Sequence, residues 1–228
     1  ENNSLLRLGK AKWNGKVIWQ TCMNGSSELV TNLSTSIVGV LYNFQLMEAA
    51  GENGVAAYGV MMYVSMIFSA AFIGYSIGTA PVVGYHDGAK NYAELRSLLR
   101  KSLVMIGVFG VCMVASAELL SSRLARIFVG YDAALMELTV SGFQIFALSF
   151  VFMGFAIYGS SFFTALNDGL TSAVISFLRT LVFQVAAVLL LPAIWDIDGI
   201  WMSIVVAEFM AVVLTAAFLA TKRRKYHY

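Results

Sequence analysis

The sequence predicts an all-α, polytopic membrane protein with six transmembrane helices. Hydrophobic residues make up 59% of its 228 residues and charged residues 12%, about half the charged fraction of an ordinary soluble domain. The mean hydropathy is +0.75. The apolar residues also form long unbroken runs, whereas a membrane β-barrel has alternating segments of about ten residues. Together these three observations favour helices that cross a lipid bilayer.

The first three helices are separated by polar segments of opposite character. The first helix, residues 17–47, ends in a loop with two acids and no bases, Glu48 to Gly54. The second, residues 55–83, leads into a basic segment from His86 to Ser102. The third helix is expected at residues 102–121. All three are long enough to cross a hydrocarbon core of about 30 Å.

The last three helices are bounded by residues that favour turns. The fourth helix, residues 135–166, is followed by Asn167-Asp168-Gly169, a sequence typical of a tight turn. The fifth, residues 170–191, is stopped by Pro192. The sixth helix covers residues 200–221. An even number of spans places both ends of the bundle on one side of the membrane.

The distribution of basic residues predicts which side that is. Residues 1–16 form a basic lead-in, 17–221 the six-helix bundle and 222–228 a basic tail. Thirteen Lys and Arg residues fall on the side of the two ends, whereas Arg123 and Arg126 alone fall on the other. This asymmetry predicts cytoplasmic termini in a plasma (inner) membrane. The net charge of +2 gives no reason to expect a nucleic-acid partner.

A polar stripe runs along the first helix from Asn24 to Asn43. At helical spacing, one face carries an acid, amides and hydroxyls, while the opposite face is apolar. Within a six-helix bundle, such a stripe is expected to face a cavity. The residues that share the polar face are Asn24, Glu28, Thr31, Asn32, Thr35, Tyr42 and Asn43.

A run at the end of the second helix points to a family. The sequence Gly78-Thr-Ala-Pro81-Val-Val-Gly84-Tyr85-His-Asp-Gly88-Ala89-Lys90-Asn91-Tyr92 resembles the multidrug and toxic compound extrusion (MATE) family, in its MepA-like branch. Further similarity lies at Glu28, at Ala165-Leu-Asn-Asp168, at Gly199-Ile-Trp201 and at Ala207-Glu208. The resemblance covers roughly residues 10–225.

The resemblance implies a fold and a function. MATE transporters have twelve spans in two six-helix halves that pack as a V around a central cavity. This chain is similar to the second, C-terminal half, and it begins without Met, so we expect a preceding N-terminal six-helix half as its partner. The implied activity is secondary active export of small organic cations by proton or sodium antiport, with no cofactor beyond the coupling ion. Some cation-coupled members carry an Asp in the fourth helix of this half, where the present chain reads Phe152-Met-Gly-Phe155.

Glu28, with Asn24 and Asn32, is the candidate cation or proton site. A carboxylate at mid-membrane costs roughly 2.5–3.5 kcal/mol, and burial raises its affinity for a proton. If a cationic drug and a proton compete for this carboxylate, antiport follows. The alternative is a structural glutamate that hydrogen-bonds the two amides. The residues expected to line the substrate cavity are Thr31, Thr35, Tyr42, Asn43, Tyr158 and Ser161.

A second expected constellation pairs Arg179 with Glu208 across the fifth and sixth helices. Their depths differ by about four residues, or about 6 Å, which an arginine side chain can bridge. The pair is either a structural ion pair or a switch whose pairing changes with conformation. Pro81, with Gly78 and Gly84, is the expected hinge, since proline frees a backbone carbonyl and bends helices.

Other functions fit the sequence less well. A lipid-linked oligosaccharide flippase, the main alternative, needs several arginines in its spans, and Arg179 is the only base at mid-span. An intramembrane enzyme needs a convergent nucleophile and base, and no histidine lies at membrane depth. Cys22 and Cys112 show neither metal-ligand spacing nor a disulfide framework, so no metal site is expected.

Overall fold

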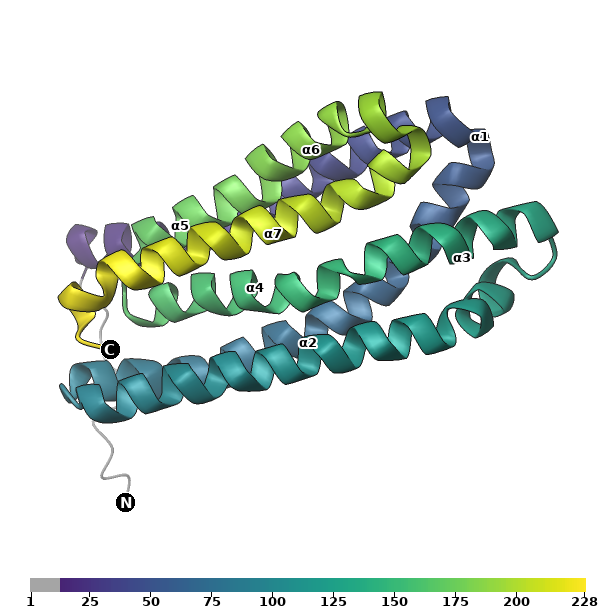
Figure 1. Ribbon diagram of the computed structural model, residues 1–228. Coiled ribbons are helices and arrows are strands. Elements are labelled where there is room, and N and C mark those ends of the chain that lie inside the picture. The colour runs from purple at the N-terminus through teal and green to yellow at the C-terminus, as the bar shows by residue number, and fades with distance from the viewer. Residues whose placement is uncertain (1–12) are drawn as a thin grey trace, which may run out of the picture.

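The computed structural model describes residues 13–228, which form a bundle of long helices. The expected basic lead-in, residues 1–16, therefore lies largely outside the described residues. Successive segments run up and down the bundle, and α1 begins at the same end at which α7 finishes (Figure 1). The elements are α1 Gly15–Gly88, α2 Tyr92–Val129, α3 Ala133–Ala147, α4 Ser149–Ala165, α5 Gly169–Phe177, the π-helical η1 Leu178–Phe183, α6 Gln184–Leu190 and α7 Pro192–Tyr226.

The number of spans agrees with the prediction. Within the described residues, α1, α2, the continuous stretch Gly169–Leu190 and α7 are each long and apolar enough to cross a membrane. The α3 and α4 pair, bent by 46°, makes a further span. Since α1 has 74 residues and is interrupted at Gly51, its two segments count separately. The six apolar segments confirm the predicted all-helical membrane fold.

A single glycine reverses the chain inside α1. Gly51 has φ 62° and ψ −149°, a conformation that is essentially restricted to glycine because a side chain would clash with the backbone. On the far side of the bend, Gly54 lies so close to the backbone carbonyl of Leu46 that an added Cβ would stand 2.9 Å from it. The expected loop from Glu48 to Gly54 is therefore one residue of non-helical backbone between two helices.

Most helices extend beyond the ends that the sequence predicted. Helix α2 begins at Tyr92 and ends at Val129, so much of the expected loops on either side of residues 102–121 is helical. Its start follows from Asn91, whose side chain accepts a hydrogen bond from the backbone N–H of Glu94. Hydropathy locates the part of a helix that lies in lipid, whereas capping residues fix where the helix begins and ends.

Two further differences concern the last three spans. The fourth is not one helix but two, which meet at Leu148 without a proline or glycine there. Helix α7 starts at Pro192 rather than at residue 200, with non-helical dihedral angles at Trp195 and Asp196. The chain therefore reverses direction just inside the nominal start of α7. The Asn167-Asp168-Gly169 turn is present as predicted, with φ 58° at Asn167.

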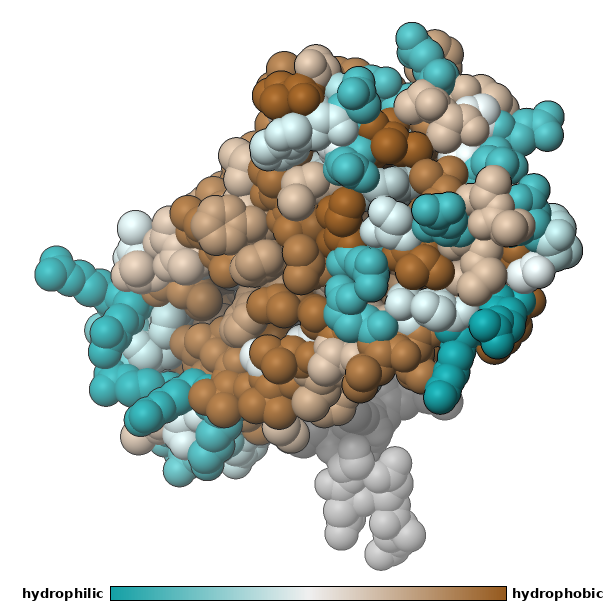
Figure 2. All heavy atoms as spheres, turned by 45° about the vertical axis from the view of Figure 1, so that its right-hand side comes forward, coloured by the Kyte–Doolittle hydropathy of each residue, from teal (hydrophilic) through white to brown (hydrophobic). Residues whose placement is uncertain are grey.

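Helix α4 occupies the centre of the bundle. It packs against α1, α2, α5 and α7, and its small residues allow close approach. An added Cβ at Gly154 or Gly159 would collide with Phe72 or Thr215, respectively. Elsewhere, large apolar side chains face outward, and Figure 2 shows hydrophobic side chains over much of the middle of one face, with hydrophilic ones gathered toward its left and right edges. This distribution suits a protein surrounded by lipid.

Candidate functional site

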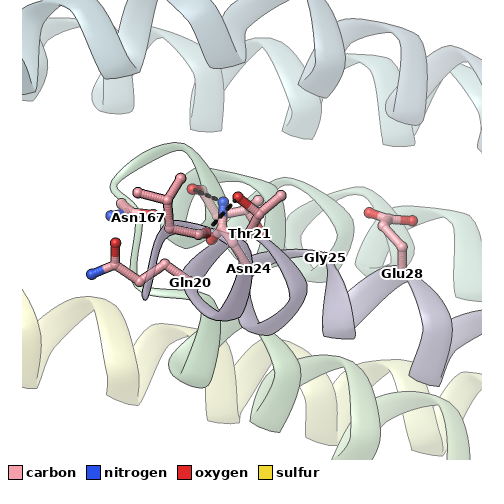
Figure 3. A pocket seen from close by; sticks show the side chains of 8 residues that line it. Gln20, Thr21, Asn24, Gly25, Glu28 and Asn167 are labelled. Atoms are coloured by element: carbon pink, nitrogen blue, oxygen red, sulfur yellow. Dashed lines mark hydrogen bonds between the residues drawn. The ribbon is translucent and has the colours of Figure 1, made fainter. Parts of the chain in front are cut away.

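A polar pocket opens beside the first turns of α1, near the end of the bundle where the chain turns from α4 into α5. Its volume is about 420 Å³, within the range of roughly 300–1,000 Å³ typical of small-molecule sites. Figure 3 shows Gln20, Thr21, Asn24 and Asn167 close together, with Glu28 farther along α1. The lining residues are Val17, Gln20, Thr21, Asn24, Gly25, Glu28, Thr164 and Asn167.

The floor of this pocket is set by a close contact between two helices. An added Cβ at Gly169, the first residue of α5, would lie 2.6 Å from the Cα of Asn24. This approach brings the Asn24 amide to α4, where its Nδ2 donates a hydrogen bond of 3.3 Å to the backbone carbonyl of Thr164. The Oδ1 atom of Asn24 is buried and has no hydrogen-bond partner within the described residues. An acceptor is thus left free beside the pocket.

Glu28 lies at the rim of the pocket and is exposed on the surface of the described chain. The alternative to a cation or proton site was a structural glutamate that hydrogen-bonds two amides, and the structure shows a different arrangement. Asn24 binds Thr164, and Nδ2 of Asn32 donates to the backbone carbonyl of Glu28. Within residues 13–228, neither amide binds the carboxylate, so the Glu28 side chain is open to a ligand.

The rest of the polar stripe divides between the surface and the interior. Asn32, Thr35 and Asn43 are exposed, and their side chains bond to backbone carbonyls one turn earlier. Thr31 is half-buried. Tyr42 is only 2% exposed and donates a hydrogen bond to Oε1 of Gln184 in α6. The stripe therefore lies along the boundary of the buried face instead of pointing in one direction.

Two expected cavity residues of α4 lie away from this pocket. Tyr158 is 1% exposed, and its ring packs beside those of Tyr75 and Phe162. Ser161 is half-buried. Neither residue contributes to the lining of the pocket. The structure places Tyr158 in the packing between α1 and α4.

Of the eight residues that line the pocket, sequence reasoning had singled out only Asn24 and Glu28 as site residues. Gln20 continues the i, i+4 series of Asn24 and Glu28 one turn earlier, so its position was readable from the spacing. Thr164 and Asn167 come from α4 and the turn after it. Their proximity to α1 depends on tertiary packing at Gly169, for which the sequence gives no direct signal.

Arg179 and Glu208 form a buried ion pair between η1 and α7. Nε of Arg179 lies 2.9 Å from Oε2 of Glu208, and its second guanidinium nitrogen lies 2.9 Å from Oε1. The side chains are 13% and 3% exposed. Two parallel N–H···O bonds give this pair strong geometric definition. The arginine sits in a π-helical stretch, an irregularity that is frequent at functional sites.

The expected hinge residues lie in continuous helix. Helix α1 runs through Gly78, Pro81 and Gly84 to Gly88, and the only non-helical dihedral angles within it are at Gly51. Gly84 approaches α4, where an added Cβ would stand 3.5 Å from the carbonyl oxygen of Ala165. In this conformation the segment is a helix with its proline included.

Asp168, in the turn between α4 and α5, binds the C-terminal end of the chain. Its carboxylate accepts a hydrogen bond of 2.8 Å from the Tyr226 hydroxyl and lies 3.3 Å from Nζ of Lys222. Burial raises the pKa of Asp168, but hydrogen bonds from Tyr226, Thr171 and Lys222 outweigh it and lower the pKa to about 2. The start of α5 and the end of α7 are thereby joined.

Comparisons with known proteins agree with this architecture. The sequence profile of the MatE family matches residues 29–189. A search of curated proteins gave no match.

Solved structures extend the likeness over nearly the whole chain. An outward-facing multidrug resistance MATE family transporter of the MOP superfamily superposes with a TM-score of 0.89 at 20% identity, covering 97% of this chain and 50% of that one. An inward-facing one gives 0.83 at 20% identity, covering 95% and 50%. A MOP superfamily transporter from Pyrococcus furiosus gives 0.86 at 20% identity, covering 95% and 49%. At this identity the likeness shows the fold, and the chain spans about half the length of these structures.

Proposed function

The chain belongs to the MatE family, and from that membership we propose that it forms one lobe of a secondary active transporter that exports small organic cations by antiport. The family is one of transporters rather than enzymes. The polar pocket with the open carboxylate of Glu28 carries the proposal. The exchanged ion is a proton or sodium.

The chemistry of the pocket supports a cationic substrate. Among residues 13–228, Glu28 is its only charged lining residue, and no ion pair in this range involves the carboxylate. The buried Oδ1 of Asn24 adds a free acceptor. The negative charge of Glu28 attracts a cation and repels an anion, while the amides and hydroxyls of the lining can hydrogen-bond either.

Antiport follows if the proton and the drug cannot bind together. A deprotonated Glu28 attracts the organic cation, and protonation removes that attraction and releases the cation. The second lobe would cover Glu28 during the cycle. Such burial strengthens the interaction of the carboxylate with a bound cation.

Further expectations belong to the same proposal. We assign the chain to the MepA-like branch and to the C-terminal half, on the strength of the run from Gly78 to Tyr92. The basic residues predict that the end of the bundle at which α1 begins and α7 ends is cytoplasmic. The partner half then meets this lobe across a central cleft, with Thr31, Thr35 and Asn43 along the wall. Pro81, Gly78 and Gly84 remain the proposed hinge.

The flippase alternative has less support. Arg179 is the mid-span base that would hold a pyrophosphate, and its guanidinium is engaged by Glu208 through bonds of 2.9–3.1 Å. An anionic head group would have to displace a buried carboxylate. The pocket on α1 carries an acid instead of a base.

The test replaces Glu28 with Gln in the complete two-lobed transporter, expressed in cells that lack other drug pumps. We expect Glu28→Gln to abolish drug resistance and drug efflux driven by a pH or sodium gradient, because the neutral amide neither attracts the cation nor exchanges a proton. Glu48→Gln is the matched control, since Glu48 is another exposed acid of α1, close to its bend. Membrane levels are measured by immunoblot. Wild-type efflux by Glu28→Gln would exclude Glu28 as the coupling site.

A further inference from the structure

A second cavity lies between α2 and α7, at the end of the bundle where the chain finishes. Its volume is about 340 Å³. The aliphatic parts of three exposed arginines and several leucine side chains line it, so its surface is almost entirely apolar, and the last residue, Tyr228, closes one side. Its main residues are Arg96, Leu99, Arg100, Leu103, Leu219 and Arg223. The proposed transport cycle makes no use of this cavity.

The residues that border the cavity change from arginine to leucine along the bundle axis. On α2, Arg96 and Arg100 lie nearer the start of the helix than Leu103. On α7, which runs in the opposite direction, Arg223 lies nearer the end and Leu219 one turn deeper. Both walls therefore place arginine toward the water-facing end and leucine toward the middle of the span. A phospholipid has the same order, with its phosphate above its acyl chains.

The arginines are free to bind an anion. Within the described residues, the ion pairs are those of Arg179 with Glu208 and of Lys222 and Lys225 with Asp168, so no carboxylate pairs with the three guanidinium groups of this cavity. Asp168, which binds the same end of α7, is already engaged by Tyr226 and Lys222.

One of the three is also held in position. Nε of Arg223 donates a hydrogen bond of 3.2 Å to the backbone carbonyl of Tyr228, and the Tyr228 side chain is only 3% exposed. The hydroxyl of Tyr228 donates in turn to the carbonyl of Leu219. The terminal NH₂ groups of Arg223 have no hydrogen-bond partner within residues 13–228 and remain free to form paired hydrogen bonds with phosphate oxygens.

We propose that this cavity binds an anionic phospholipid. The phosphate lies among Arg96, Arg100 and Arg223, and an acyl chain follows Leu103 and Val104 into the bilayer. Val104 is 61% exposed, so its side chain is accessible to an acyl chain of the surrounding lipid. The volume is at the lower end of the range for ligand sites, and the apolar lining suits the first part of an acyl chain, with the phosphate bound by the exposed guanidinium groups beside the cavity. Basic pockets between transmembrane helices are suited to such head groups.

The experiment measures lipid binding by native mass spectrometry of the full chain released from detergent micelles. The probes are phosphatidylglycerol and phosphatidylcholine with identical acyl chains. We expect the wild type to retain phosphatidylglycerol in preference to phosphatidylcholine. The double variant Arg96→Gln/Arg100→Gln should retain phosphatidylglycerol about tenfold more weakly, because charge-assisted hydrogen bonds are lost. Arg123→Gln/Arg126→Gln is the matched control, since these arginines are exposed near the other end of the same helix, and it should retain the lipid like the wild type.

Two further arms separate the possible outcomes. Arg100→Lys keeps the charge and should retain part of the preference for phosphatidylglycerol. If Arg123→Gln/Arg126→Gln lost as much lipid as Arg96→Gln/Arg100→Gln, the effect would be one of overall charge and the proposed site would be overturned. Inorganic phosphate is added as a competitor. Its failure to displace the lipid supports a lipid site, and full displacement at low millimolar concentration would assign the cavity to free phosphate. Equal retention of the two lipids by the wild type would also overturn the proposal.

Discussion

The carboxylate of Glu208 is 3% exposed and depends on one guanidinium, that of Arg179, for its charge balance. Removing one partner of a buried ion pair typically costs about 3–5 kcal/mol, because the other charge remains buried and unpaired. We predict a loss of this size in unfolding free energy for Arg179→Gln, measured by denaturation in detergent. The charge-swapped variant Arg179→Glu/Glu208→Arg should recover much of it.

The controls for this pair distinguish charge from packing. Arg179→Met/Glu208→Leu fills a similar volume without charge and is expected to cost much less than either single change, since apolar replacement of a buried pair is often near neutral. Arg123→Gln, at an exposed position, should have almost no effect. If a single change at Arg179 or Glu208 left the chain as stable as either double variant, the ion pair would contribute little to stability. A switch role for the pair would then lose its basis.

The lowered pKa of Asp168 predicts that the stability of the folded chain depends on pH in the acid range. Its pKa is lowered from 3.8 to about 2 in the folded chain, so its contribution to stability is complete above pH 3.8 and is lost as the pH falls through about 2. The melting temperature of the wild type should therefore exceed that of Asp168→Asn at neutral pH, with a gap that closes in strong acid. Thermal unfolding in detergent between neutral pH and pH 2 measures it. A gap independent of pH would contradict the ion pairs of Asp168 with Lys222 and Lys225.

Among the residues, those set by local spacing were predictable and those set by packing were not. The i, i+4 positions of Asn24 and Glu28 follow from the sequence. The similar depths of Arg179 and Glu208 in neighbouring helices were enough to predict that the two side chains meet. The burial of Tyr158 and the place of Thr164 in the pocket depend on how α4 packs against α1. The helical periodicity of the sequence does not show how one helix packs against another.

At the scale of the element, the bend at Gly51 is the sharpest feature of α1. Its φ of 62° with ψ −149° disfavours any side chain, and we predict that Gly51→Ala lowers the unfolding free energy by about 1–3 kcal/mol. Gly59→Ala is the matched control. An added Cβ at Gly59 meets nothing within 4 Å, and alanine favours a helix by up to about 1 kcal/mol over glycine. Denaturation in detergent should thus move the two variants in opposite directions, and similar behaviour would argue against a strained turn.

The elements also show the limit of hydropathy. It located six apolar spans but not the extension of α2 from Tyr92 to Val129, because the added turns are polar or amphipathic and still helical. It gave no sign of the 46° bend between α3 and α4, where neither proline nor glycine marks the break. Tertiary packing sets this geometry, so a single-sequence pattern cannot reveal it.

At the scale of the whole molecule, one exposed face of α1 combines polar and charged side chains with large apolar ones. Glu28 and Asn32 are exposed there beside Leu29 and Leu33, which are 61% and 59% exposed. Lipid can cover the leucines, but a carboxylate facing hydrocarbon is costly. A second lobe that encloses a hydrated cleft would resolve this conflict, since Glu28 would then face water or substrate. The matched structures are about twice as long as this chain, which leaves room for such a lobe.

This arrangement predicts that the chain alone inserts and folds but does not transport. With one wall of the cleft, there is no enclosed path whose access can alternate between the two sides of the membrane. Purified chain in proteoliposomes should show helical circular dichroism and a cooperative unfolding transition, yet no accumulation of a fluorescent organic cation when a pH or sodium gradient is imposed. The complete two-lobed transporter, reconstituted at the same protein-to-lipid ratio, is the positive control. Gradient-driven uptake by the single lobe, abolished by Glu28→Gln, would show that two copies of this chain suffice and that no different second half is required.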